Sequence, residues 1–348
     1  MKTYKVNLKP RSEITSIPSS DTLFGAICWG IRLLYGEAKL KEILSRFVSN
    51  APPFVLSSSF PISSSGIMFL PKPKLKRLSP ETIISIAKER CKDDKRKESM
   101  FNVMSRYKRF AKISYLSESL FKAVLEGKVS EESLFKDYLN ETIAEKGGFL
   151  LKEESHLPQD KFSCDEIRVR TKIDRLSSST IGEGEMFHSE TKIISGGFSL
   201  FFLLKTDEIE FLKTLIDKDK FLSDHGVGGD RTIGLNHFKL SVEETDLKLG
   251  GEGKRFVTLS KYIPNSNEIN TDGDGISYDV IPWVSRVDNS YDFQGERLIK
   301  DRVFYMKEGS VFEVNERKEF HGRVMKVCNI GEERIYQNGL AFPLFFNS

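Results

Sequence analysis

Apolar and polar side chains alternate along several short stretches of the chain, and a period of two is typical of half-buried strands. Near the N-terminus the alternating residues are Tyr4, Lys5, Val6, Asn7, Leu8 and Lys9. This pattern predicts a strand with an apolar face and a basic face. The basic face suits a nucleic acid, although a solvent-exposed edge strand carries lysines in the same way. Residues 199–204 (SLFFLL) are apolar on both faces and predict a central strand.

Apolar residues recur at helical spacing between residues 20 and 47. Ser20 or Asp21 is expected to cap the first helix. Gly36 is suited to end it, and a second short helix follows. A further helix is predicted over residues 209–216, after the central strand. The apolar face of the first helix consists of Leu23, Ile27, Ile31 and Leu34.

These recurring strand, helix, strand units predict an α+β fold of the ferredoxin-like or RRM-like type. We expect this module to span residues 1–245. Further strand-like runs, among them DRVFYMKEGSVFEV and LAFPLFF, predict a second, β-rich domain over residues 246–348. A chain of 348 residues is long enough to bury a core in each of two domains.

The stretch from about residue 80 to residue 155 is strongly charged and helical in pattern, and it predicts a helical insertion on the surface. Its basic residues interleave with aromatic ones in the order Arg106, Tyr107, Lys108, Arg109, Phe110 and Lys112. Such a pattern is able to contact a nucleic-acid backbone, but a solvated basic face is the commoner outcome.

A long β-hairpin is predicted over about residues 165–195, with the sequence IRVRTKIDRLSSSTIGEGEMFHSE at its centre. Its first arm alternates apolar residues with basic ones, and an apolar pair begins the return arm. The residues concerned are Arg168, Arg170, Lys172 and Arg175, followed by Met186 and Phe187. Cations beside an apolar wedge are a recurrent means of holding and kinking a single strand. A two-stranded ribbon is seldom stable alone, so we expect it to rest on a partner. The alternative is an ordinary surface hairpin.

A glycine-rich loop is predicted over residues 225–234, HGVGGDRTIG, in front of another strand-like run. Glycine tolerates positive φ and lets the backbone approach a ligand, so the N–H groups of such a loop suit an anion. Arg231 would add a forked cation. The loop fits neither the dinucleotide fingerprint nor the Walker pattern, because a strand follows it and Leu235 and Asn236 replace Lys and Ser/Thr. A plain glycine-rich turn remains the alternative.

Overall composition adds little to this picture. The formal net charge is only +3, so the placement of basic residues matters more than their number. The four cysteines are far apart and form no C-x-x-C pair, which argues against a zinc knuckle or a disulfide framework and favours a reducing cytoplasm. The first residues lack the apolar run of a signal peptide, and no stretch approaches the length of a membrane span.

No catalytic, metal-binding or cofactor-binding pattern is evident. His188, His225 and His237 are the candidates for acid–base chemistry, but none has an evident partner in sequence. Residues 270–275 imitate the start of an EF-hand loop, yet Ile281 stands where the bidentate Glu is required. We therefore expect a polar turn there and no bound metal.

Four stretches together resemble a known family: SDTLFGAICWGIR, IRVRTKIDRLSSSTIGEGEMF, GVGGDRTIGL and ERIYQNGLAFPL. In this order they resemble the RAMP superfamily, and within it the fourth subunits of type III-A CRISPR Csm complexes, which cap the 5′ end of the guide RNA. Residues 72–160 carry no matching motif. The family's loop usually has another glycine near Asn236, and this chain has none there.

The resemblance implies a non-catalytic RNA-binding subunit that holds the repeat-derived 5′ tag of the crRNA. It implies a cleft lined by the glycine loop and a hairpin that acts as a thumb, kinking the RNA where tag meets guide. The first turn of the first helix would face the same RNA. The implied RNA-binding residues are Ser20, Asp21, Thr22, Arg168, Arg170, Lys172, Arg175, Met186, Phe187, Gly226, Gly228, Gly229, Asp230, Arg231 and Gly234.

Partners are implied by the same resemblance. Family members contact the large polymerase-like subunit and the backbone nuclease subunit, and they meet target RNA only through the complex, where base pairing supplies the specificity. Two other hypotheses remain at this point. The first is a RAMP-type endoribonuclease that cuts CRISPR repeat RNA with His188 or His225 as base, and the second is an RRM-like protein outside CRISPR.

Overall fold

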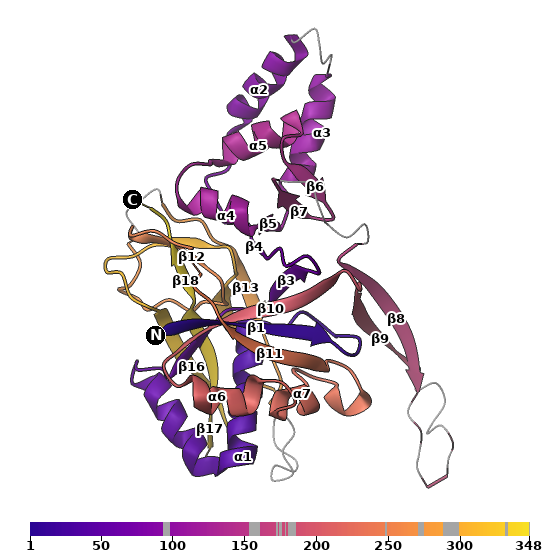
Figure 1. Cartoon of the computed structure of the whole chain (residues 1–348), viewed down its shortest axis with the longest axis vertical. Coiled ribbons are helices and arrows are strands. Elements are labelled where there is room, and N and C mark those ends of the chain that lie inside the picture. Colours follow the sequence, from indigo (N-terminus) through magenta and orange to yellow (C-terminus); the bar gives the residue numbers. More distant parts are fainter. Residues whose placement is uncertain are drawn as a thin grey trace.

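The computed structural model describes residues 1–92, 98–152, 161–171, 173, 176–177, 179, 186–247, 249–270, 275–287, 299–330 and 333–347. A mixed arrangement of helices and sheets is visible in Figure 1, with the helical insertion at the top and a long hairpin at the side. Among the described residues, no helix combines the length and the apolar character that crossing a membrane requires.

An antiparallel sheet in the order β11-β1-β10-β2 forms the centre of the molecule, and β3 extends it along β10. This is the strand order of a ferredoxin-like module and confirms the predicted fold class. The strand β1 lies inside the sheet and not at its edge, so the edge-strand alternative was wrong. The bounds are β1 (Lys2–Pro10), β2 (Phe54–Leu56), β3 (Phe60–Ser63), β10 (Phe198–Thr206) and β11 (Phe238–Glu244).

Three helices cover one face of this sheet: α1 (Ser20–Val48), α6 (Ile209–Ile216) and α7 (Phe221–His225). Gly36 interrupts α1 with φ 84°, which confirms the predicted stop and the second helical segment after it. The predicted cap was wrong by one residue, because Ser19 occupies the N-cap position. Its hydroxyl donates to the carboxylate of Asp21, 2.6 Å away, and makes no capping bond.

The insertion contains the predicted helices and also a small sheet, in the order β4-β5-β7-β6, which the sequence pattern did not indicate. Strands of three residues are too short for a period of two to be visible in the sequence. Phe110 is fully buried and Arg106 is paired with Glu98, so the interleaved aromatic and basic residues serve partly as core. The bounds are β4 (Phe69–Pro71), α2 (Pro80–Lys92), α3 (Met100–Phe110), β5 (Tyr115–Ser117), α4 (Glu118–Leu125), α5 (Glu131–Asn140), β6 (Ala144–Lys146) and β7 (Phe149–Leu151).

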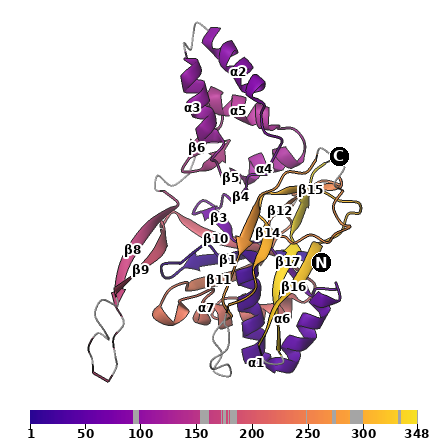
Figure 2. The same cartoon turned by 180° about the vertical axis from the view of Figure 1, so that it is seen from behind.

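All the helices and strands named among the described residues after residue 245 are strands, and this part is β-rich as predicted. Side chains from it, such as Leu259 and Phe342, share one core with Phe201 and Leu203 of the central strand. The long ribbon β16–β17 lies alongside α1, as Figure 2 shows. The bounds are β12 (Arg255–Thr258), β13 (Val280–Trp283), β14 (Val303–Met306), β15 (Val311–Glu313), β16 (His321–Ile330), β17 (Glu333–Ala341) and β18 (Pro343–Phe345).

The predicted hairpin consists of β8 (Ser163–Thr171) and β9 (Met186–Ile194), and its strands pair in register from Ser163–Ile194 to Thr171–Met186. In Figures 1 and 2 it projects away from the body of the molecule. Its exposed apolar residues include Ile167, Val169 and Met186. Such exposure agrees with the expectation that the hairpin rests on a partner.

Candidate nucleic-acid interface

The base of the hairpin and the glycine loop meet at residues 13–15. The carbonyl oxygen of Glu13 accepts a hydrogen bond from the backbone N–H of Asn236 at 2.8 Å. Its carboxylate accepts one from the Thr191 hydroxyl at 2.9 Å and pairs with Arg168. One residue therefore connects the two segments, and they lie on the same side of the molecule.

Asn236 fixes the loop to this junction. It has φ 59°, in the left-handed region that Gly and Asn adopt most readily. Its buried side-chain amide donates to the Gly229 carbonyl at 2.6 Å and to the Thr15 hydroxyl at 2.9 Å, and its oxygen accepts the Thr15 N–H at 2.9 Å.

The loop needs glycine at two of the predicted positions for reasons of geometry. Gly226 has φ 80°, and a Cβ there would lie 2.9 Å from the Asn236 carbonyl oxygen. Gly228 has φ 104°, and a Cβ there would lie 3.6 Å from the methyl group of Thr22, in the first turn of α1. The loop and the helix start are therefore in close approach. A short 3₁₀ helix, η1 (Arg231–Ile233), follows and ends at Gly234.

A groove of about 940 Å³ runs beside this contact, between α1, the loop and the C-terminal strands. Thr22, Gly228, Gly229 and Arg231 line it on one side, and Trp283 lines it on the other. Three acidic residues among its described lining are paired with lysines: Asp21 with Lys261, and Glu37 and Glu333 with Lys41. Basic residues outnumber them, and these are Arg32, Lys41, Arg231, Arg286, Lys300 and Arg334. The groove therefore has an excess of positive charge, as a phosphate backbone requires.

The side chains of Ser20 and Asp21 are buried and make their contacts within the protein. The Ser20 side chain is 0% exposed, and its oxygen accepts the backbone N–H of Lys261 at 3.1 Å. Asp21 and Lys261 form an ion pair of 2.9 Å in which both side chains are 5% exposed. The ammonium group also lies 3.2 Å from the centre of the Trp283 ring. These two residues join α1 to the C-terminal strands. Their neighbour Thr22 lines the groove.

The hairpin separates the two residues that were predicted as one apolar wedge. Phe187 lies opposite Arg170, and Ser189 lies opposite Arg168. Directly opposed residues of an antiparallel pair share a face, so Phe187 lies on the cationic face and Met186 on the other. The cationic face is also the face of Thr191, which contacts Glu13. The predicted residues Lys172 and Arg175 lie outside the described residues.

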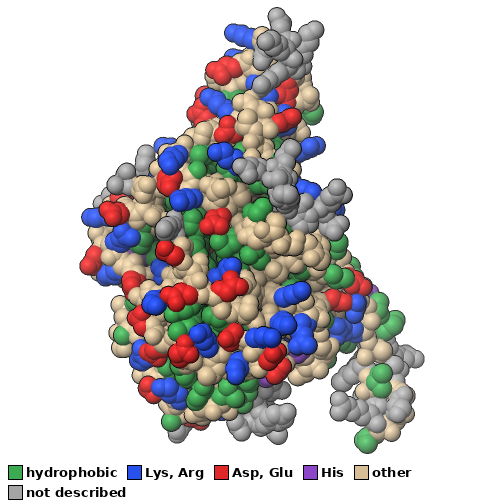
Figure 3. Space-filling model, viewed as in Figure 1, with side chains coloured by type: hydrophobic (Ala, Val, Ile, Leu, Met, Phe, Trp, Pro, Cys, Tyr) green, Lys and Arg blue, Asp and Glu red, His purple; other side chains and the backbone are tan. Residues whose placement is uncertain are grey.

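Three exposed cations lie at this junction: Lys9, which the predicted basic face of the first strand includes, and Arg11 and Lys239, which the sequence analysis missed. Lys9 and Lys239 are directly opposed on β1 and β11, and the Arg11 N–H donates to the His237 carbonyl at 2.8 Å. Figure 3 shows Lys and Arg side chains gathered over the ends of these strands, beside the hairpin. The alternating pattern placed Lys9 on a basic face, but only the strand pairing brings Lys239 next to it.

The candidate histidines are dispersed. His188 lies opposite Val169, on the face of the hairpin away from Arg168 and Arg170. His225 stacks on Phe221 with ring centres 4.6 Å apart, and a ring nitrogen of His237 contacts the Arg231 carbonyl at 3.1 Å. No cluster of three or more His, Cys, Asp or Glu residues suited to a metal ion occurs within the described part of the chain.

Comparisons with known proteins agree on one family. A family model described as the RAMP superfamily matches residues 17–235. The Csm4 protein of a CRISPR system of Thermococcus onnurineus (strain NA1) is 25% identical over 340 residues, covering 97% of this chain and 95% of that protein.

Solved structures share the fold along the whole chain. The Csm3–Csm4 subcomplex of a type III-A CRISPR-Cas interference complex matches with a TM-score of 0.62 and 18% identity, covering 100% of both chains. A Csm1–Csm4 cassette in complex with cA4 matches with a TM-score of 0.56 and 19% identity, covering 100% of this chain and 98% of that chain.

Proposed function

Because the chain belongs to the RAMP superfamily, we propose that it is a non-catalytic, RNA-binding subunit of a type III-A CRISPR effector complex. In this role it holds the repeat-derived 5′ tag of a crRNA. The likeness to the Csm4 protein over nearly the whole chain supports this assignment. The observation that carries it is that the glycine loop lines one groove with the first turn of α1 and is joined to the hairpin base through Glu13 and Asn236.

The tag backbone would enter the groove beside Gly228 and Gly229, where the absence of side chains lets phosphate groups approach the main chain. Arg231 supplies a guanidinium group that can bind a phosphate in a bidentate manner. From there the strand would pass the exposed cations at the ends of β1 and β11 and reach the cationic face of the hairpin. On that face Phe187 offers a ring to a base next to Arg170.

Two protein partners follow from the solved relatives, in which Csm4 occurs with Csm1 and with Csm3. We propose that this chain likewise binds the large subunit and the backbone subunit of its own complex, in the cytoplasm. The apolar face of the hairpin, with Ile167, Val169 and Met186, is exposed in the single chain and suits burial against another subunit.

The test measures the affinity for labelled RNA that carries the repeat-derived tag, as a function of salt. Arg231→Ala and Arg170→Ala should each weaken binding and reduce the slope of log K against log salt by about 0.7, the value for one phosphate contact on a single strand. Arg109→Ala is the matched control, because Arg109 is an exposed arginine on the distant helix α3.

An unchanged slope in both Arg231→Ala and Arg170→Ala would contradict the proposal, as would an equal loss in Arg109→Ala. The endoribonuclease hypothesis is tested in the same samples. Cleavage of repeat RNA without added metal, abolished by His188→Ala or His225→Ala, would replace the binding role with a catalytic one.

A further inference from the structure

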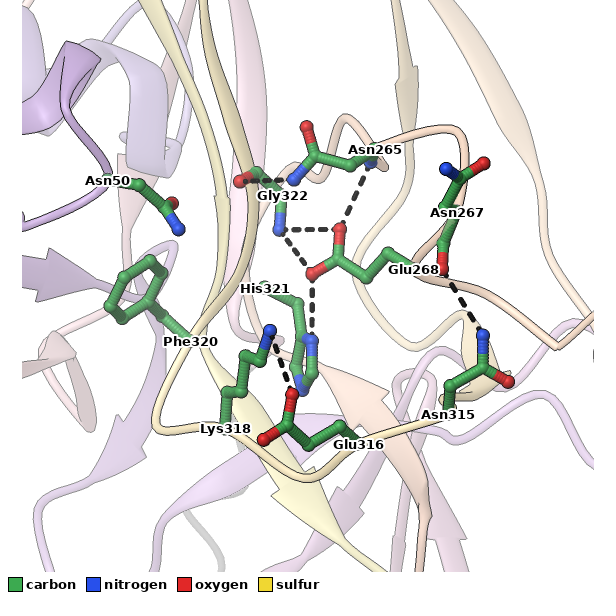
Figure 4. Close-up of a pocket in the computed structure, with 10 residues that line it drawn as sticks. All are labelled: Asn50, Asn265, Asn267, Glu268, Asn315, Glu316, Lys318, Phe320, His321 and Gly322. Carbon is green, nitrogen blue, oxygen red and sulfur yellow. Dashed lines mark hydrogen bonds and ion pairs between the residues drawn. The ribbon is translucent and has the colours of Figure 1, made fainter.

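A second pocket, of about 250 Å³, opens among the C-terminal strands and is separate from the groove. We refer to it as the His321 pocket, and its lining includes Asn50, Asn265, Asn315, Phe320 and His321. Figure 4 shows Asn50 and Phe320 on one side of it, Asn267 and Asn315 on the other, and His321 between them. Neither the motif analysis nor the proposed tag-binding role makes use of these residues.

His321 is held in one orientation by Glu268. The His321 side chain is 1% exposed, and its Nδ1 lies 2.8 Å from the Glu268 carboxylate. That carboxylate also accepts the N–H groups of Gly322, at 2.8 and 2.9 Å, and of Asn265, at 3.0 Å. Burial alone would raise the pKa of Glu268, but the hydrogen bonds from His321, Asn265 and Gly322 outweigh it and hold the pKa below its ordinary value.

An ionised carboxylate only accepts hydrogen bonds, so Nδ1 of His321 is the donor, and Nε2 is an acceptor in the form of the ring that carries a single proton. Nε2 is buried and has no hydrogen-bond partner among the described residues. In Figure 4 it is turned away from Glu268, toward Glu316 and Lys318. A buried polar atom without a partner is costly, and a ligand that donates an N–H would satisfy it.

The charged carboxylates and ammonium of the described pocket lining are those of Glu268, Glu316 and Lys318. Glu316 and Lys318 form an ion pair of 3.1 Å whose side chains are 75% and 54% exposed, and Glu268 is satisfied by three N–H groups. Surface ion pairs stabilise little, so this pair can open. With Glu316 offset by Lys318, the lining keeps the negative charge of Glu268, which disfavours a phosphate group and favours a ligand that offers N–H donors.

We infer that the His321 pocket receives a single unstacked nucleobase. Its volume suits one base better than a larger ligand. The ring of Phe320 offers a stacking surface, and the Asn side chains can hydrogen-bond to a base edge while Nε2 of His321 accepts an N–H. Its position supports this inference, because Ser49 lines the groove and the next residue, Asn50, lines the pocket. An RNA strand that leaves the groove at the end of α1 would therefore reach it.

The experiment follows the imidazole NMR signals of the full chain during titration with adenosine, guanosine, cytidine and uridine. At least one nucleoside should shift the His321 signal in a saturable manner and leave that of the exposed His188 unchanged. Phe320→Ala and Asn315→Ala should each weaken this binding at least fivefold. His321→Gln removes the imidazole that reports binding, so binding to this variant is followed by a second signal. The variant should no longer bind the specific nucleoside and should retain the fold.

The inference is overturned when no nucleoside moves the His321 signal, or when ribose alone moves it equally. A shift with guanidinium and none with nucleosides would assign the pocket to a cationic side chain of a partner protein. Although the biological source of the base depends on the proposed RNA-binding role, the two claims fail separately. Arg231→Ala should leave the nucleoside titration unchanged. If no nucleoside binds, a loss of tag-RNA affinity in Phe320→Ala would not rescue the inference about the pocket.

Discussion

At the scale of single residues, Asn236 combines two functions that glycine could not combine. Its backbone adopts a left-handed conformation with φ 59°, and its side chain makes three hydrogen bonds that fix the loop to Thr15 and Gly229. A glycine would keep the conformation and lose the bonds. The loop in this chain is therefore held by side-chain contacts in addition to its own backbone geometry.

Two substitutions separate these contributions. Asn236→Gly should lower the free energy of unfolding by about 1–2 kcal/mol, because the groups that the Asn236 side chain bonds at this buried site lose a hydrogen-bond partner. Asn236→Ala should lower it further, because alanine is strained in the left-handed region. Thermal and denaturant unfolding of both variants measure the difference. Equal stability of the glycine variant and the parent protein would show that the side-chain bonds contribute nothing.

Lys205 gives a residue-scale prediction about pH. Burial on the central strand lowers its pKa from 10.5 to about 8, although the nearby Glu319 raises it. Between pH 8 and 10.5 the unfolded chain binds more protons than the folded one, so stability should rise with pH in this window. Lys205→Met should remove this rise and stabilise the protein at pH 7 by up to about 3 kcal/mol. Melting temperatures across that range test it, and an unchanged pH profile in the variant would contradict it.

At the scale of elements, the pairing of β8 with β9 assigns different tasks to adjacent residues. Phe187 shares a face with Arg170, and Met186 shares the opposite face with Val169. The side chains are 51% and 67% exposed, so neither contributes much to the stability of the isolated chain. The cationic face turns toward Glu13 and the loop, whereas the apolar face turns away from them.

This arrangement predicts opposite outcomes for two alanine variants. Phe187→Ala should weaken binding of the tag RNA by about 1–3 kcal/mol, the contribution of one stacked base. Met186→Ala should leave RNA affinity unchanged and instead weaken assembly with partner subunits. Fluorescence anisotropy with labelled RNA and size-exclusion chromatography of the reconstituted complex distinguish them. If Met186→Ala reduced RNA affinity as much as Phe187→Ala, the assignment of the faces would fail.

The sequence predicted elements whose signal is local. The alternation of Tyr4, Val6 and Leu8, the stop at Gly36 and the loop glycines all depend on neighbouring residues, and the structure confirms the elements they define. Contacts between distant segments carry no such signal. The burial of Asp21 depends on Lys261, and the placement of Met186 and Phe187 on opposite faces depends on the register with β8.

At the scale of the whole molecule, the C-terminal strands contribute to the core of the central sheet, in addition to two smaller clusters of their own. Leu259, Phe342 and Leu344 pack with Phe201 and Leu203 on the face of the sheet that the helices leave open. The buried pair Asp21–Lys261 fixes α1 to the same strands. A sheet with one apolar face uncovered is not stable in water, so the two predicted domains should depend on each other.

The mutual dependence of the two predicted domains can be tested with a fragment that lacks the C-terminal strands. A fragment of residues 1–245 would uncover part of the core around Phe201 and Leu203, and it would remove Lys261, the ammonium partner of Asp21. We expect the fragment to be insoluble or to lack dispersed NMR signals, and the full chain to unfold in a single calorimetric transition. Asp21→Ala in the full chain should be strongly destabilising, since Lys261 would remain buried and unpaired. A folded, soluble fragment, or two resolved transitions in the full chain, would show instead that residues 246–348 form an independent domain.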